Sequence, residues 1–122
     1  MPGCSVIREV LGTTARYVIS GKFEGACAWD LSQRLEQETL PEMVVDFSQV
    51  SDFVDYGIAV VASALLALPP ARRIEMRGLR QHQARLFRYF GVDPEELAHR
   101  TVVAPRTPQS TGPRPVRANE VA

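Results

Sequence analysis

The segment 46–55 gathers the oxygen-bearing side chains of this chain that could carry out chemistry: Asp46, Ser48, Ser51, Asp52 and Asp55. Its three carboxylates could serve as general acid and base, or could bind Mg²⁺ through their oxygens. The segment contains no histidine that could act as a base and no Lys or Arg that could hold an anionic group. Ser and Asp residues at this density are typical of turns and helix caps. We therefore expect no catalytic residue and no metal site here.

Other catalytic and cofactor-binding motifs are also missing from the sequence. His82 and His99 are the only histidines, and neither stands in an HExxH or Cys-x-x-Cys frame. There is no Gly-rich phosphate loop and no Gly-x-Ser-x-Gly motif. We expect no cofactor, and an enzyme that uses the Asp cluster is the weaker alternative.

Two apolar elements must position the segment. Residues 43–45, Met-Val-Val, form a run that suits a strand covered on both faces. Residues 58–68 hold Ser63 as their only polar side chain, which predicts a helix buried in the core or offering its spare face to a partner. We expect residues 47–55 to form a loop between them, with Asp55 either as the N-cap of the helix or at its positive N-terminal end. The helix is too short to cross a bilayer.

The chain before this segment predicts a hairpin and a helix. Residues 5–10 and 15–20 favour strands on either side of a turn. Residues 26–38 repeat apolar side chains at helical spacing. Trp29 lies to one side of that stripe, and we expect it to pack in the core or at its rim.

The chain after the segment predicts a strand and two helices. Prolines at 69–70 stop the apolar helix. Residues 73–77 alternate charged and apolar side chains, as a strand does, and residues 81–90 form an amphipathic helix. Gly91 predicts a left-handed helix cap, and Asp93, followed by proline, predicts the N-cap of a short helix to about residue 99. Residues 101–103 could add a brief edge strand.

Size and composition indicate one ordered domain. The chain has 122 residues, with 14 basic and 14 acidic side chains, so no net field would attract nucleic acid or an anionic membrane. Residues 105–122 contain four prolines among polar residues and no apolar face, which predicts a disordered tail after a domain at 1–104.

The N-terminus and the cysteines indicate a cytoplasmic protein. The first residues are neither basic nor apolar enough to be a signal peptide, and we expect no membrane insertion. In the cytoplasm Cys4 and Cys27 would both be reduced thiols.

Taken in order, these stretches resemble the STAS domain family (sulfate transporter and anti-sigma factor antagonist). The signature of that family is an apolar strand, Asp-aliphatic-Ser, a short loop, and Asp-Ser-Ser/Thr-Gly-aliphatic at the start of a helix. Residues 44–48 resemble its first half, and Gly57-Ile58 resembles the end of its second half. Residues 73–79 and 86–92 resemble its next strand and helix. The resemblance implies an α/β fold with a mixed four- to five-stranded sheet and helices packed mainly on one face.

The chain departs from the family at the phosphorylated serine. Aligned without a gap, that serine falls on Asp55; with a one-residue deletion, it falls on Tyr56. We expect Asp55 to act as a pseudo-phosphosite, because a helix N-terminus favours negative charge. In the alternative, a phosphate on another hydroxyl would act as the switch. The candidates are Ser48, Ser51 and Thr107.

The resemblance implies a non-catalytic interaction module in bacterial signalling or transcription regulation. Its partner would be an anti-sigma factor or kinase-like ATPase, a STAS paralogue, or the ATPase of a lipid-transport ABC system. A second copy of the chain is a further candidate. We expect the following residues to bind the partner: Ser51, Asp52, Phe53, Asp55, Tyr56, Gly57 and Ile58.

Overall fold

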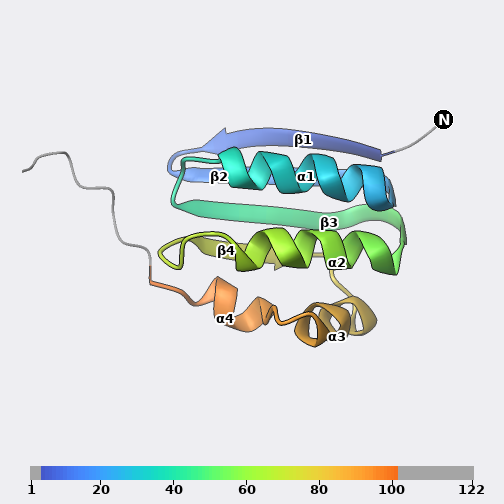
Figure 1. Ribbon diagram of the computed structural model, residues 1–122. Helices are drawn as coiled ribbons and strands as arrows, with labels where there is room; N and C mark the ends of the chain where they lie inside the picture. Colours follow the sequence, from blue (N-terminus) through green and yellow to red (C-terminus); the bar gives the residue numbers. More distant parts are fainter. Residues whose placement is uncertain (1–3, 102–122) are drawn as a thin grey trace, which may run out of the picture.

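A computed structural model describes residues 4–101 and contains one mixed sheet with helices mainly on one face (Figure 1). The sheet order is β1-β2-β3-β4, and α1 and α2 lie side by side across the sheet. The strands are β1 (Cys4–Leu11), β2 (Thr14–Phe23), β3 (Glu42–Phe53) and β4 (Arg73–Arg77). The helices are α1 (Gly25–Gln37), α2 (Asp55–Leu66), α3 (Gln81–Tyr89) and α4 (Pro94–Ala98). This confirms the predicted fold class.

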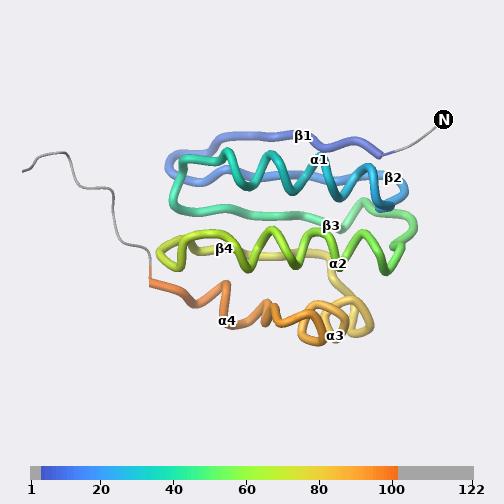
Figure 2. The backbone as a smooth tube through the Cα atoms, viewed as in Figure 1, coloured from blue at the N-terminus to red at the C-terminus, as the bar shows by residue number. Residues whose placement is uncertain are grey.

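Connection length determines how the strands pair. A tight turn at Gly12, whose φ is 63°, joins β1 to β2 as an antiparallel hairpin. Helices α1 and α2 carry the chain back across the sheet, so β2, β3 and β4 are parallel (Figure 2). The carboxyl ends of β2 and β3 therefore lie at the same edge, where α1 and α2 begin.

The core lies between the sheet and the two helices. Alternate residues of β2 and β3 point toward the helices, and the apolar stripes of α1 and α2 meet them. The residues that fill this layer are Ala15, Tyr17, Ile19, Met43, Val45, Phe47, Ala28, Leu31, Leu35, Ile58, Val61 and Leu65.

Strand β3 is longer than predicted, and the expected loop over residues 47–55 is wrong. The strand continues to Phe53, opposite Phe23 at the end of β2. The rings of Phe47 and Phe53 both pack against Phe23, with centroids 5.3 Å and 5.9 Å from it. Pairing and ring packing override the turn preference of Ser51 and Asp52.

Helix α2 also begins earlier than expected. Asp55 is its first residue rather than its N-cap, which is Val54, and no side chain caps this end. Of the two places expected for Trp29, the core is wrong, because the residue is 55% exposed on α1, and it lies at the rim of the core instead. Trp29 lies beside the buried stripe of α1 and not within it, so its side chain faces away from the core.

Cys4 and Cys27 form a disulfide, so the expectation of two reduced thiols is wrong. The hairpin brings the start of β1 beside the first turn of α1, and the two Cα atoms lie 5.9 Å apart, within disulfide range. The residues are 23 positions apart in sequence, so their proximity depends on the hairpin and on the return of α1. The bond joins the edge strand to α1.

Glu38, after α1, is a buried carboxylate that ties three parts of the fold together. Arg8 of β1 donates to its two oxygens at 2.7 and 3.0 Å, and the Tyr17 hydroxyl donates to one of them. The backbone N–H groups of Thr39 and Leu40 each donate at 3.0 Å. The hydrogen bonds from Arg8, Tyr17 and Leu40 lower the pKa of Glu38 to about 2, and burial together with Glu38 raises the pKa of Tyr17 to about 12.

The strand and the two helices after α2 match their predictions, but Thr101, the one described residue of the edge strand expected at 101–103, is not in a strand. Gly91 has φ of 94°, and Val92 N–H donates to Phe87 O at 2.8 Å, which confirms the left-handed cap. The Asp93 carboxylate accepts from Glu95 N–H at 3.0 Å, which confirms the N-cap of α4. Residues 102–103 of the expected edge strand and the tail 105–122 lie outside the described residues. Within residues 4–101, no helix is long and apolar enough to span a membrane.

Candidate functional site

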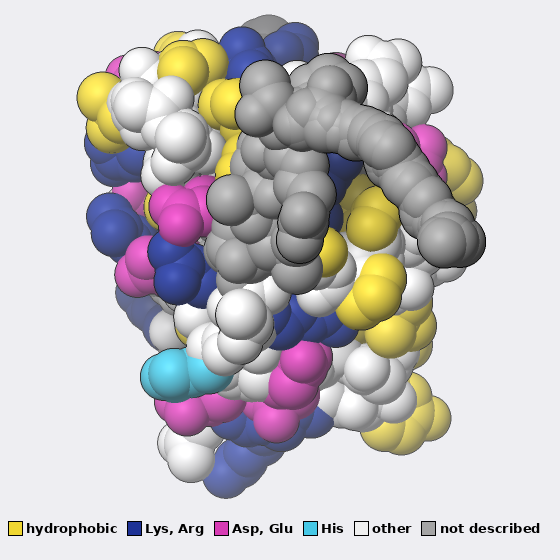
Figure 3. All heavy atoms as spheres, turned by 90° about the vertical axis from the view of Figure 1, so that its left-hand side faces the viewer, with side chains coloured by type: hydrophobic (Ala, Val, Ile, Leu, Met, Phe, Trp, Pro, Cys, Tyr) yellow, Lys and Arg dark blue, Asp and Glu magenta, His cyan; other side chains and the backbone are white. Residues whose placement is uncertain are grey.

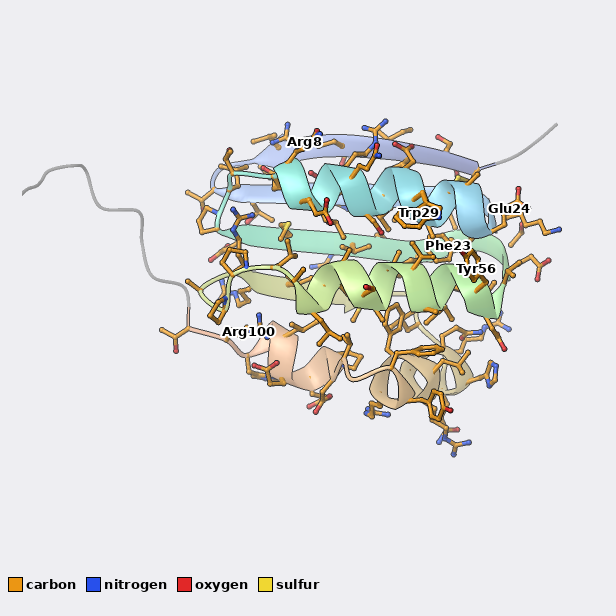
Figure 4. All side chains as sticks on the ribbon, viewed as in Figure 1. Arg8, Phe23, Glu24, Trp29, Tyr56 and Arg100 are labelled. Atoms are coloured by element: carbon orange, nitrogen blue, oxygen red, sulfur yellow. A yellow bond between two sulfur atoms is a disulfide. The ribbon has the colours of Figure 1, made fainter. Side chains whose placement is uncertain are left out.

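The candidate site lies at the edge of the sheet where β2 and β3 end and both long helices begin. Val54 N–H donates to Phe23 O at 3.0 Å, which ties the end of β3 to the end of β2. In open sheets of parallel strands with crossover helices, ligands commonly bind outside the carboxyl ends of the strands. Figure 4 shows Phe23, Glu24 and Tyr56 together at this edge.

Asp55 and Tyr56 occupy the exposed first turn of α2. The side chain of Tyr56 is 59% exposed, and its ring lies over Gly25 at the start of α1. Asp55 stands among backbone N–H groups that have no partner within the helix, so its negative charge is favoured there. This turn offers an aromatic ring with a polar tip and a carboxylate on a rigid element.

Gly57 and Ile58 are buried beneath that turn. A Cβ at Gly57 would lie 3.1 Å from Phe23 O, so the glycine lets α2 approach the end of β2 closely. Ile58 is fully buried in the core. These two residues, expected at the contact, hold Asp55 and Tyr56 in place from below.

Ser51, Asp52 and Phe53 line a separate polar hollow of about 250 Å³. Its other walls come from the turn after β4 and the start of α3, through Gly78, Arg80 and Gln83. Gly78 has φ of 81°, and a Cβ there would clash with the backbone of Ser48. The seven predicted contact residues thus divide between this hollow, the exposed turn of α2 and the core.

The carboxylates of the segment do not meet. Asp46 pairs with Arg16 at 2.9 Å and accepts from Ser48 N–H at 2.9 Å, on the sheet face away from α1 and α2. Hydrogen bonds from Ser48, with a further contribution from Arg16, lower the pKa of Asp46. Among residues 4–101, no three His, Cys, Asp or Glu side chains are placed to hold a metal ion.

Sequence reasoning missed a groove of about 370 Å³ between α1 and α2. Trp29 and Ser32 of α1 line one wall, and Tyr56 stands at one end of the groove. The signal that could have found it is the position of Trp29, outside the buried stripe of an amphipathic helix. The other lining residues are Glu36, Ala59, Val60, Ser63, Ala64 and Ala67.

Comparisons with known proteins agree with this geometry. A family model described as "Mlab, STAS domain" matches residues 12–100. The anti-sigma factor antagonist SpoIIAA in its unphosphorylated form is similar in structure, with a TM-score of 0.54, 15% identity, and coverage of 70% of this chain and 83% of that one. An anti-sigma factor antagonist from Mycobacterium paratuberculosis gives a TM-score of 0.56 and 20% identity over 75% and 86% of the two chains. Identities this low show a shared fold. A search of curated proteins finds no match.

Proposed function

Since the chain belongs to the STAS domain family, we propose that it is a non-catalytic module that docks on another protein through the first turn of α2. The observation that carries this proposal is the placement of Tyr56, an exposed aromatic side chain on a rigid turn at the carboxyl edge of the sheet. Tyrosine is a common anchor of protein interfaces, because it combines a large apolar ring with a polar tip.

The module binds its partner constitutively in this proposal. Asp55 supplies a permanent negative charge where the family carries its phosphorylated serine, so no kinase is needed to set the state of this turn. Ser51, in the neighbouring hollow, is exposed. A phosphate on Ser51 would therefore be the alternative switch, and it would add negative charge beside Asp52.

The partner is a protein of a signalling or transport system. The two similar structures carry the name anti-sigma factor antagonist, which supports an anti-sigma factor, a kinase-like ATPase or a STAS paralogue as the partner. The family model carries the name Mlab instead, and for that reason we keep a second candidate, a STAS subunit bound to the ATPase of a lipid-transport ABC system.

Co-purification from the native cells tests the proposal. The tagged protein is compared with its Tyr56→Ala and Asp55→Ser variants, and Tyr89→Ala serves as the matched control because Tyr89 is an 81% exposed tyrosine on α3. We expect Tyr56→Ala to lose the partner and Tyr89→Ala to retain it. Equal recovery with Tyr56→Ala, or stoichiometric phosphate between residues 51 and 56 by mass spectrometry, would contradict the proposal.

A further inference from the structure

The groove between α1 and α2 has a wall of small side chains on which a third helix could pack. Ala59 and Ser63 of α2 and Ala67 at its C-cap follow one another at intervals of four, so they form one line of small side chains along the wall of the groove. Small side chains let a third helix approach closely, at the short end of the usual spacing between helix axes. Trp29 and Tyr56 supply aromatic contact surface on the same groove.

A buried hydroxyl on this groove has no hydrogen-bond partner among residues 4–101. Ser32 of α1 is 3% exposed and lines the groove, and no group within residues 4–101 forms a hydrogen bond with its Oγ. A buried hydroxyl left without a hydrogen bond costs stability. Unlike the line of small residues, this observation points to an occupant, because a polar group on the occupant would complete the missing hydrogen bond.

The two helices that form the groove are acidic. They carry Asp30, Glu36 and Asp55 and one base, Arg34, which pairs with Asp30 at 3.1 Å. Glu24 adds a further carboxylate at the N-cap of α1. An occupant with basic side chains along its edges would complement this charge.

The opposite face of the sheet has a smaller imbalance of charge, although its hollow of about 580 Å³ is larger. Its arginines form ion pairs with carboxylates of neighbouring strands. Figure 3, which views the molecule from the left-hand side of Figure 1, shows Lys or Arg and Asp or Glu side chains as neighbours on that side of the surface. The pairs are Arg16 with Glu9 and Asp46, Arg73 with Glu42, and Arg77 with Glu75. These pairs join three arginines to four carboxylates, so the two signs are mixed on this face and the pairs leave only one unbalanced negative charge to select an occupant.

We propose that the α1–α2 groove binds a basic amphipathic helix of the partner protein. The apolar face of that helix packs on the line of small residues and on Trp29, its Lys or Arg side chains flank the groove, and one polar side chain bonds Ser32 Oγ. This inference rests on the proposed function and names the chemistry of the partner.

Binding of a designed peptide tests the groove without the native partner. The probe is a helix of about 15 residues with Leu, Ala and one Gln on one face and Lys on the other; its control carries Glu in place of Lys. Trp29 is the only tryptophan of the chain, so its fluorescence reports on this groove. We expect the Lys peptide to bind at least about tenfold more tightly than the Glu peptide, with a difference that shrinks as salt rises. Equal affinities would overturn the proposal.

Variants of the groove locate the binding site. Ser63→Arg and Ala67→Arg each place a bulky cation on an exposed groove position, whereas Gln33→Arg adds the same side chain to α1 outside the groove. We expect about tenfold or greater loss for the two groove variants and less than about twofold change for Gln33→Arg. Circular dichroism checks that each variant is folded. Unchanged affinity in both folded groove variants would overturn the proposal.

The role of Ser32 has its own test. In the wild type, the Gln peptide should bind about threefold to tenfold more tightly than one with Ala at that position, because the amide completes the hydrogen bond. In Ser32→Ala the preference should vanish, and the free protein should be no less stable than wild type. A Gln preference that persists in Ser32→Ala would contradict the assignment.

Two results would identify a different occupant. If sedimentation shows a dimer of the full chain that Ser63→Arg dissociates, the groove holds a second copy. If peptide affinity rises when Arg106, Arg114 and Arg117 are replaced by Gln in the full chain, the occupant is the chain's own C-terminal segment. Either result overturns the proposal of a partner helix. If the native partner is lost with Tyr56→Ala but retained with Ser63→Arg, the proposed function stands and the groove inference fails.

Discussion

The ring of Tyr56 lies over the backbone of Gly25, so the first turns of α1 and α2 are in direct contact. A Cβ at position 25 would lie 3.0 Å from Cε2 of Tyr56, closer than carbon atoms ordinarily pack. The orientation of the exposed ring on α2 therefore depends on the absence of a side chain on α1.

The first prediction concerns this contact. We expect Gly25→Ala to displace the Tyr56 ring and to weaken partner binding about tenfold, while the melting temperature stays the same or rises, since Ala favours a helix over Gly by up to about 1 kcal/mol. Titration with the purified partner and thermal unfolding measure the two effects. Ala26→Ser, a change at the next exposed residue, is the control. Full affinity in Gly25→Ala would show that ring orientation is unimportant.

Stability should fall in acid because of Glu38. Its pKa is about 2 in the folded protein, against 4.5 for an unperturbed glutamate, so its stabilising effect is full above pH 4.5 and is lost as the pH falls toward 2. The whole effect is about 3 kcal/mol, to order of magnitude. Denaturant unfolding at a series of pH values should show that the free energy of unfolding falls between pH 4.5 and pH 2 in the wild type and in Glu36→Gln. The fall should be much smaller in Glu38→Gln. If the free energy of unfolding falls as much in Glu38→Gln as in the wild type, Glu38 is not the source of the acid sensitivity.

Alkaline conditions should weaken the same cluster through Tyr17. The pKa of Tyr17 is raised to about 12 from 10, so its contribution is full below pH 10 and is lost as the pH rises toward 12. We expect Tyr17→Phe to remove this alkaline loss of stability, with absorbance of the tyrosinate ion as the direct reading of the titration. Titration of the buried hydroxyl near pH 10 would contradict the raised pKa.

The Cys4–Cys27 bond should stabilise the fold. It closes a loop with a sequence separation of 23, for which chain entropy suggests about 3 kcal/mol, on the order of 10 °C in melting temperature for a domain of this size. We expect a double variant, Cys4→Ala with Cys27→Ala, to melt lower than the oxidised wild type by this amount, and dithiothreitol to lower the wild type to the same temperature. A wild type insensitive to dithiothreitol would argue against the bond.

Removal of residues 105–122 should leave the melting temperature within a few degrees of the full chain. The segment holds four prolines and no run of apolar side chains, and residues without buried surface add little stability. Differential scanning calorimetry of the two proteins measures the change. A large drop would mean that the segment docks on the domain and that the boundary at residue 104 is misplaced.

Much of the fold could be predicted because it depends on local pattern. The alternation of charged and apolar side chains at residues 73–77 corresponds to β4, and the helical spacing of apolar side chains at 81–90 corresponds to α3 with a one-residue error. Asp93 caps α4, as the proline and glutamates after it predict. The exposed part of the candidate site, Asp55 and Tyr56, was also predictable, since it adjoins the start of a strongly apolar helix.

The rest required contacts between residues that are distant in the sequence. Ser51 and Asp52 favour a turn by themselves, but pairing of Phe53 with Phe23 keeps them in β3. The Cys4–Cys27 bond depends on the hairpin that folds β1 back toward α1. The groove exists only because two crossover helices pack side by side.

By itself, the sequence determined the order of strands and helices. The repeat of apolar side chains that distinguishes a strand from a helix involves residues only two to four positions apart. Only the tertiary structure decided which residues are exposed and which are buried. It buried Gly57 and Ile58, exposed Trp29, and left Ser32 buried without a described partner. Exposure and hydrogen bonding depend on what packs against a side chain from elsewhere in the chain, and that is decided when the sheet and the two helices come together.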